Sequence, residues 1–320
     1  MLQQIEGFLP SEVIDAHVHI YDSSFTPMLR GKGMFAEDHQ DAADYFRYIK
    51  DVIPFSACKR AVFLPPPEAS FGPACSETRK LFARFMAVEL EKNPMSIGTA
   101  FVGPEDTIQD IEKLLVHHHI RGLKCYFSSS SNRWNALPDE FLPESAWQIA
   151  NEHAMFIVLH LGRAKALADT GNMDYIKTMA AQYPRAKLVL AHCGRSFAAW
   201  TAVGSIKELG QFKNIFYDIS SINEVSPIVN CLKYAGKGHV FWGSDFPVST
   251  FVGRAVSIGE SFAWLDQKAL QATDAGIKPV TVLEENLMAA YLAADMLDLT
   301  ADDVRALFYT NAERILFSND

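Results

Sequence analysis

VIDAHVHI, residues 13–20, is a largely apolar stretch that carries two histidines near its end. Its Val and Ile content predicts a buried β-strand. Side chains two positions apart in a strand point to the same face, so His17 and His19 would lie side by side. Neutral imidazoles bind zinc and similar ions, which makes the pair a candidate half of a metal site. Taken alone, the pattern also fits two ordinary histidines beside a core.

Seven further β-like stretches follow, separated by segments in which apolar residues recur at helical spacing. The stretches are RAVFLP (60–65), SIGTAFV (96–102), RGLKCYF (121–127), MFIVLHL (155–161), AKLVLAH (186–192), NIFYDIS (214–220) and HVFWGSD (239–245). The helical segments include residues 78–91, 107–118, 144–153, 175–182 and 225–235. This alternation predicts parallel strands, and eight of them favour a (β/α)₈ TIM barrel, one domain over residues 1–320. A doubly wound sheet is the alternative.

Two connections are longer than a barrel needs. Residues 21–41 follow the first strand, and residues 246–300 follow the eighth. The second segment contains helical runs, among them 283–297, and we expect it to form a helical insertion after strand eight. Both would lie at the C-terminal face of the barrel, where substrate-binding loops are found.

Composition and charge exclude several classes of protein. The 320 residues are 49% hydrophobic, with 29 basic and 38 acidic residues and a formal net charge of −9. Such a balance is typical of a globular protein and offers no basic surface for nucleic acid. The apolar stretches are too short to span a bilayer, so we expect no membrane association.

The cysteines and the N-terminus indicate a reducing compartment. The five cysteines include no C-x-x-C pair, which argues against a disulfide framework or a four-cysteine zinc site. MLQQIEGFLPSE, residues 1–12, lacks the basic start and apolar run of a signal peptide. We therefore expect a cytoplasmic protein with free thiols, and leave open whether it forms a homo-oligomer.

Polar side chains also end three other predicted strands. His160 ends the fifth, His192 the sixth and Asp245 the eighth. In a parallel barrel these ends meet at one rim, so the three side chains would face His17 and His19. A buried carboxylate or imidazole without a partner is costly, and a shared metal ion would remove that cost.

These motifs resemble those of a known family. HVH on strand one, HLG on strand five, HCG on strand six and GSDFP on strand eight resemble the amidohydrolase superfamily, and in particular its "amidohydrolase 2" branch of TIM-barrel metal-dependent hydrolases and decarboxylases. VRALFYTNAERIL, residues 304–316, is similar to the closing helix of that branch. The order and spacing of the motifs carry the resemblance over nearly the whole chain.

The resemblance implies a role for each residue. His17, His19, His160 and Asp245 would hold one divalent metal ion, zinc with manganese as the alternative. Asp245 would also accept a proton, and His192 would act as an acid/base or stabilise an oxyanion. Other members of the superfamily hold two metals bridged by a carboxylated lysine on strand four, where this chain has Lys124, so a two-metal site remains the alternative.

A second set of residues predicts how a substrate is held. Arg163 and Arg195 each follow a rim histidine by three residues, in HLGR and HCGR. A guanidinium binds a carboxylate through two parallel hydrogen bonds, so a small anionic substrate is expected. Lys124 and Tyr126, on strand four, could line the same site. The alternative for each arginine is an ion pair with a structural acid.

Three functions fit this pattern. The leading hypothesis is a metal-dependent hydrolase that opens a small carboxylated lactone or amide with a metal-activated water. The alternative is a non-oxidative decarboxylase, which is a carbon–carbon lyase, or a hydratase, acting on an aromatic or dienoic acid. A barrel that binds metal without catalysis is the third, and the full set of rim residues argues against it.

Overall fold

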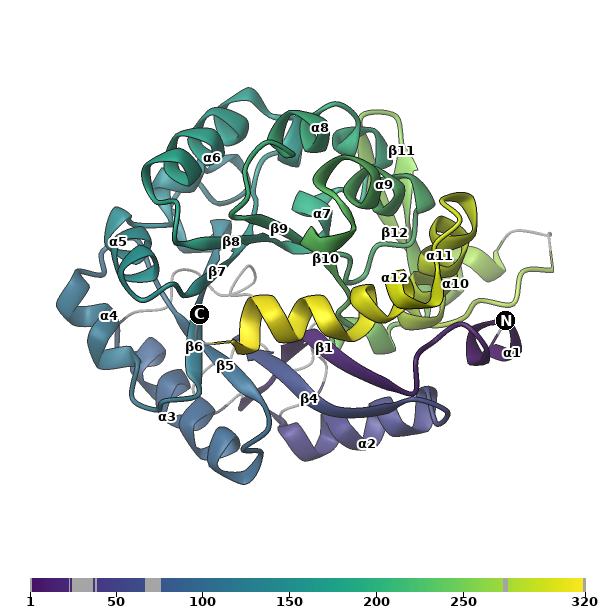
Figure 1. The fold of residues 1–320 in the computed structure, drawn as a ribbon, viewed down its shortest axis with the longest axis horizontal. Helices are drawn as coiled ribbons and strands as arrows, with labels where there is room; N and C mark the ends of the chain where they lie inside the picture. Colours follow the sequence, from purple (N-terminus) through teal and green to yellow (C-terminus); the bar gives the residue numbers. More distant parts are fainter. Residues whose placement is uncertain are drawn as a thin grey trace.

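The protein is a (β/α)₈ barrel, seen in a computed structural model that describes residues 2–22, 24, 37, 39–66, 76–272 and 276–318. Eight strands form one parallel sheet in the order β1-β4-β5-β6-β7-β8-β9-β10, which curls into a ring (Figure 1). Their bounds are β1 Glu12–His19, β4 Ala57–Leu64, β5 Ile97–Phe101, β6 Ile120–Tyr126, β7 Phe156–His160, β8 Lys187–Leu190, β9 Ile215–Asp218 and β10 Val240–Phe241. The order follows the chain without reversal, so the barrel prediction is confirmed over a doubly wound sheet.

The ring closes between the last strand and the first. The Asp245 backbone N–H donates to the His17 carbonyl at 2.8 Å, and the His19 N–H donates to the Phe246 carbonyl at 2.7 Å. Gly243 allows this approach, because a Cβ there would lie 2.7 Å from the Cβ of His17. The seam therefore joins the two segments that carry the predicted metal residues.

Helices cover the outside of the ring, as the alternation predicts (Figure 1). They are α2 Ala42–Val52, α3 Ser76–Lys92, α4 Ile108–Leu114, α5 Glu144–Glu152, α6 Thr170–Gln182, α8 Ser205–Leu209 and α9 Val225–Asn230, with the short helix α1 Leu2–Glu6. The segment α7, Ala191–Arg195, is instead a tight turn at the end of β8, with left-handed backbone at His192, Cys193 and Gly194. Thr107 caps α4 through a capping box with Asp110. Helix α4 ends at Leu114, earlier than the predicted range of 107–118.

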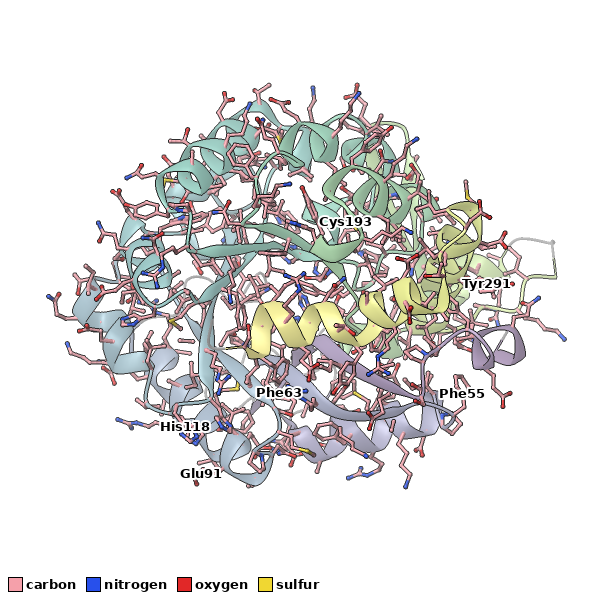
Figure 2. The ribbon with its side chains drawn as sticks, viewed as in Figure 1. Phe55, Phe63, Glu91, His118, Cys193 and Tyr291 are labelled. Atoms are coloured by element: carbon pink, nitrogen blue, oxygen red, sulfur yellow. The ribbon has the colours of Figure 1, made fainter. Side chains whose placement is uncertain are left out.

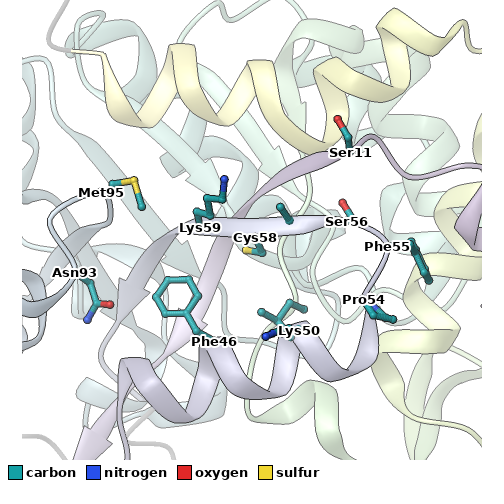
Figure 3. A pocket seen from close by; sticks show the side chains of 12 residues that line it. Ser11, Phe46, Lys50, Pro54, Phe55, Ser56, Cys58, Lys59, Asn93 and Met95 are labelled. Carbon is teal, nitrogen blue, oxygen red and sulfur yellow. The ribbon is translucent and has the colours of Figure 1, made fainter.

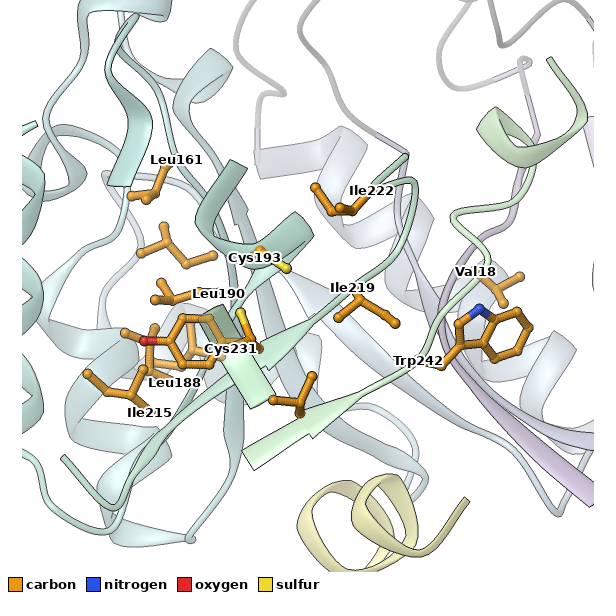
Figure 4. Packing of buried hydrophobic residues seen from close by; sticks show 14 of the residues in the cluster. Val18, Leu161, Leu188, Leu190, Cys193, Ile215, Ile219, Ile222, Cys231 and Trp242 are labelled. Carbon is orange, nitrogen blue, oxygen red and sulfur yellow. The ribbon is translucent and has the colours of Figure 1, made fainter. Parts of the chain in front are cut away.

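Apolar side chains fill two layers. Leu188, Leu190 and Ile215 from β8 and β9 pack outward in one cluster with Cys193 and Cys231 (Figure 4). The four cysteines in the described part of the chain are free thiols, as expected; Cys75 lies outside it. A second cluster fills the inside of the ring and includes Ile315 and Leu316.

The C-terminal segment closes the N-terminal end of the barrel. Helix α12, Ala301–Arg305, continues through π-helical turns at Ala306–Thr310 and Glu313–Phe317 and crosses the ring (Figure 1). Its Asn311 amide donates to the Val240 carbonyl at 2.8 Å. Because this end is plugged, a substrate must enter from the opposite, C-terminal end.

The insertion after strand eight is only partly helical. Helix α11, Val282–Met296, confirms the predicted helix at 283–297, and α10 spans Gln267–Gln271. Before them, β11 Gly253–Ile258 and β12 Ser261–Asp266 form an antiparallel hairpin that the helical expectation missed. Gly259, with φ of +59°, supplies the left-handed backbone that the two-residue turn requires.

Part of the other predicted active-face segment, residues 21–41, lies outside the described residues. The part that is described contains β2 Tyr21–Asp22 paired with β3 His39–Gln40.

His118 and Glu91 lie at the outer edge of the molecule, whereas Cys193 is fully buried (Figure 2). Within the described ranges, no helix is long and apolar enough to cross a membrane.

Candidate metal centre

Three acceptor atoms meet at the seam between β10 and β1. The two Nε2 atoms of His17 and His19 lie 3.2 Å apart. Asp245 Oδ1 lies 3.5 Å from the first and 3.2 Å from the second. Ligands about 2.0–2.1 Å from a tetrahedral ion lie about 3.3 Å from one another. The three side chains therefore have the spacing of three corners of a tetrahedral metal site.

The hydrogen bonds of both histidines leave lone pairs aimed at this point. His17 Nδ1 lies 3.1 Å from Asp218 Oδ2, and His19 Nδ1 lies 2.9 Å from the Pro65 carbonyl. Each acceptor requires that Nδ1 carries the proton, so each Nε2 is an unprotonated acceptor. Burial lowers the pKa of His17 to about 3 and also lowers the pKa of His19. The lone pairs of the two Nε2 atoms and the Asp245 carboxylate oxygen face one another with no proton between them, so a cation is needed to offset their repulsion. The residues therefore fit a divalent metal ion.

Asp245 is held in place from both sides. Ser221 Oγ donates to its Oδ2 at 2.7 Å, which leaves Oδ1 facing the histidines. Burial raises its pKa, but the nearby His192, His19 and His17 hold the pKa down at about 2. The backbone of Asp245 has φ of +64°, an uncommon value for a non-glycine residue that often marks functional sites.

His192 lies beside this cluster in a left-handed turn after β8. Its Nδ1 is 2.9 Å from the Ser220 carbonyl and 3.9 Å from Asp245 Oδ2. His17, His192 and Asp245 each offer a ligand atom within 4.8 Å of the others. Position alone therefore does not decide whether His192 is an acid/base group, as predicted, or a further metal ligand.

His160 lies on the other side of His192, with their ring centroids 5.0 Å apart. Burial lowers the pKa of His160 well below its ordinary value, so the ring is neutral. Neither His160 nor His19 is in the group of His17, His192 and Asp245 within the described part of the chain, but His19 Nε2 lies 3.2 Å from Asp245 Oδ1, and no such distance ties His160 to the described metal residues. Its ligand role therefore stays a prediction.

Asp218, at the end of β9, is a site residue that the sequence analysis missed. Its carboxylate binds His17 Nδ1 and also accepts the His192 backbone N–H at 3.0 Å and the Ser220 N–H at 3.1 Å. Burial opposes its charge, but His17, the charge of His192 and the Ser220 hydroxyl hold the pKa of Asp218 well below its usual range. A carboxylate directly after the apolar run IFY was the available signal.

Lys124 and Tyr126 lie on β6 at the floor of the site. The Lys124 ammonium is fully buried, has no hydrogen-bond partner among the residues that the structure describes, and stands 4.6 Å from the centre of the Tyr126 ring. Burial lowers the pKa of Lys124 to about 8, partly offset by the charges of Asp218 and Asp245. Tyr126 donates to the Pro65 carbonyl at 2.7 Å. Lys124 is thus an unpaired polar group beside the metal residues.

The two predicted substrate arginines have different surroundings. Arg163 Nε lies 2.9 Å from Asp169 Oδ2, so it has a structural acid as its partner. Arg195 is only 7% exposed and donates to the Arg163 carbonyl at 2.7 Å. Burial lowers the pKa of Arg195 to about 10, which leaves it charged at neutral pH.

Aromatic rings surround the Arg195 guanidinium. Its central carbon lies 5.8 Å from the ring of Phe127, 5.1 Å from Trp134 and 5.4 Å from Phe262. Phe262 comes from the β11–β12 hairpin, and its ring is 5.0 Å from that of Phe197, which lies against His192. The hairpin therefore reaches the rim of the site.

The closed barrel with this polar cluster at its C-terminal end defines a TIM barrel of the metal-dependent type. The sequence matches the amidohydrolase 2 family, described as amidohydrolase, over residues 14–317. The chain therefore belongs to the amidohydrolase 2 family. Membership of this family supports an enzymatic function for the chain. No curated protein matches the sequence.

Solved structures share the fold at low identity. An amidohydrolase from Burkholderia multivorans with bound zinc is 14% identical, with a TM-score of 0.61 and coverage of 95% of this chain and 98% of that one. The 5-carboxyvanillate decarboxylase of Novosphingobium aromaticivorans with bound manganese is 15% identical, with a TM-score of 0.59 and 97% of both chains covered. A Pseudomonas putida protein provisionally described as a 2-pyrone-4,6-dicarboxylic acid hydrolase is 14% identical, with a TM-score of 0.57 and coverage of 96% and 98%.

Proposed function

We propose that this protein is a metal-dependent hydrolase of a small carboxylated substrate. One divalent ion, most simply zinc, would be held by His17, His19, His160 and Asp245. The observation that carries the proposal is the convergence of the two Nε2 atoms and Asp245 Oδ1 within 3.5 Å of one another. When bound, the ion would act as a Lewis acid and lower the pKa of water.

The chain supplies a base and an acid next to that point. Asp245 is ionised at neutral pH, because its pKa is about 2, and its Oδ1 can accept a proton from an attacking water. His192 donates Nδ1–H to the Ser220 carbonyl, which leaves Nε2 as its free ring nitrogen. That nitrogen would carry a proton to the leaving group or stabilise developing negative charge.

Arg195 is the group we assign to the substrate carboxylate. It is a buried cation, and no carboxylate of the described residues forms an ion pair with it, whereas Arg163 is held by Asp169. Rings around the guanidinium exclude water and so strengthen a charged hydrogen bond.

Decarboxylation is the second candidate, and the aromatic surroundings of Arg195 favour it. Phe127, Trp134 and Phe262 would accommodate the flat ring of an aromatic acid. In that reaction, His192, protonated at Nε2, would deliver a proton to the ring carbon that loses CO₂. The two reactions share their residues and differ in the bond that breaks.

Two measurements separate these functions. Elemental analysis of protein purified without chelators should give one metal equivalent per chain; two equivalents with a modified Lys124 would contradict the single-ion site. The loaded protein is then assayed with 2-pyrone-4,6-dicarboxylate and 5-carboxyvanillate, following acid production and CO₂ release separately. Acid without CO₂ supports the hydrolase, and CO₂ release supports the lyase.

The variant that tests the catalytic role of His192 in this assay is His192→Ala. We expect the variant to keep its metal and lose about 10²–10⁴-fold in turnover, the usual contribution of a proton-transfer group. Loss of the metal instead would make His192 a ligand. A metal-loaded wild-type protein that turns over no carboxylated lactone, amide or aromatic acid would contradict both catalytic proposals.

A further inference from the structure

A cavity lies away from the metal residues, on the flank of the barrel between α2 and β4. Its volume is ≈ 620 Å³, within the range of small-molecule sites. Cys58 is at its centre, with Phe46 and Phe55 on either side (Figure 3). Cys58 pairs with Val13 near the start of β1, whereas His19 pairs with Leu64 near the end of β4. Six residues of strand, about 20 Å, therefore separate the cavity from the metal residues.

The lining combines apolar surface with positive charge. Phe46, Phe55 and Met95 supply the apolar part, and Met95 is 56% exposed. Lys50 from α2 and Lys59 from β4 border the cavity, and Figure 3 shows the Lys59 side chain extending away from Phe46 and Cys58; no acidic side chain is among the described residues that line the cavity. Lys59 lies 3.6 Å from Glu12, outside the lining, while Lys50 forms no ion pair with the described residues. Lys50 therefore leaves one positive charge at the cavity without an acidic partner among the described residues, which favours an anionic ligand.

Buried hydrogen bonds connect the floor of the cavity to the metal residues. The Cys58 sulfur lies 3.1 Å from the Tyr45 hydroxyl, which donates to Asp15 Oδ2 at 2.8 Å. Asp15 Oδ1 accepts the backbone N–H groups of His17 at 3.1 Å and Ser244 at 2.8 Å. A molecule in contact with Cys58 is thus two side chains away from the backbone that holds His17 and Asp245.

We propose that this cavity is a second ligand site, which binds an amphipathic monocarboxylate and is linked to the metal centre through Tyr45 and Asp15. The apolar body of the ligand would cover Phe46, Phe55 and Met95, and its carboxylate would bind Lys50, joined by Lys59 once that side chain turns away from Glu12. The arrangement suits a medium-chain fatty acid better than a short polar acid, because most of the lining side chains are apolar or only weakly polar. The proposal does not depend on which reaction takes place at the rim.

Calorimetric titration with decanoate and with decanol tests the binding. Decanoate should bind and decanol, of equal length without charge, should bind at least about tenfold more weakly. Lys50→Met combined with Lys59→Met should lower decanoate affinity about 10-fold or more, while the matched exposed pair Lys113→Met with Lys213→Met should not. Equal affinity for the two probes, or an unchanged Lys50→Met/Lys59→Met variant, would overturn the proposal.

Two controls fix the place of binding. Arg195→Met should bind decanoate like the wild type, because that arginine is at the rim; loss of binding in this variant would place decanoate there and overturn the second site. Sedimentation should show the same oligomeric state with and without decanoate. A wild-type oligomer that excludes decanoate would mean that a second copy of the chain covers the cavity instead.

Metal affinity measures the link to the rim. Saturating decanoate should change the dissociation constant of the metal about fivefold or more in the wild type, measured by competition with a chelator. Tyr45→Phe removes the hydroxyl between Cys58 and Asp15, so it should keep decanoate binding and lose this effect. An unchanged metal affinity in the wild type, or an equal effect in Tyr45→Phe, would refute the link.

Discussion

Replacing Asp218 by Asn should weaken metal binding although Asp218 is not a predicted ligand. The carboxylate accepts four hydrogen bonds, from His17 Nδ1, the His192 N–H, the Ser220 N–H and the Ser220 hydroxyl. An amide of the same shape has only one acceptor oxygen and brings two N–H groups of its own. Some of the four donors must therefore lose their partner.

The bond to His17 decides the size of the effect. It fixes the proton on Nδ1, and both side chains are 1% exposed, so water cannot replace the carboxylate. Loss of such an outer carboxylate typically lowers metal affinity about 10–100-fold. That corresponds to about 1.4–2.7 kcal/mol at 25 °C.

Competition with a fluorescent chelator at neutral pH gives the metal dissociation constant of each variant, and circular dichroism checks the fold. Asp169→Asn is the matched control, because Asp169 caps α6 and pairs with Arg163, and among the described residues it contacts none of His17, His19, His192 and Asp245. Ser220→Ala separates the effect on His192 from the effect on His17. Wild-type metal affinity in a folded Asp218→Asn protein would refute the idea that Asp218 sets the proton of His17.

Three further outcomes are expected. The folded-state pKa of Lys124, about 8, lies below its unfolded value of 10.5, so the unfolded chain binds more protons between these pH values. Wild-type unfolding free energy in urea should therefore rise with pH across this window by about 3 kcal/mol relative to Lys124→Met; parallel pH curves would contradict the burial of a charged amine. His160→Ala should lose metal in a folded protein, and full occupancy by elemental analysis would remove it from the ligand set. Arg195→Met should lower kcat/KM on a carboxylated substrate about 10–150-fold, with Arg163→Met nearer wild type, and the reverse order would exchange their roles.

The barrel could be predicted from the sequence because strand and helix periodicities are local. The histidines of β1 followed from the alternation of side chains along one strand. The hairpin β11–β12 was missed because the helical run at 283–297 suggested that the whole insertion is helical. Gly259, at the turn of the hairpin, was the available signal.

The finer parts of the site depend on contacts between distant segments. Arg163 and Arg195 follow their histidines with the same spacing, and only the fold shows that Asp169 pairs with the first while rings surround the second. Asp218 gains its role from a histidine on a strand far along the chain. These contacts form only when the barrel closes, so they cannot be read from the sequence of any single segment.

Closure at the seam gives a bound ion a second effect, on the entropy of the unfolded chain. The hydrogen bond from the Ser244 N–H to Asp15 joins residues 229 positions apart, and His17 and Asp245 lie beside it. Strand β10 itself contributes only two paired residues. An ion held by both segments would act as a cross-link around almost the entire barrel, and cross-links that close long loops restrict the unfolded ensemble most. The first and last strands would then separate only when the ion leaves.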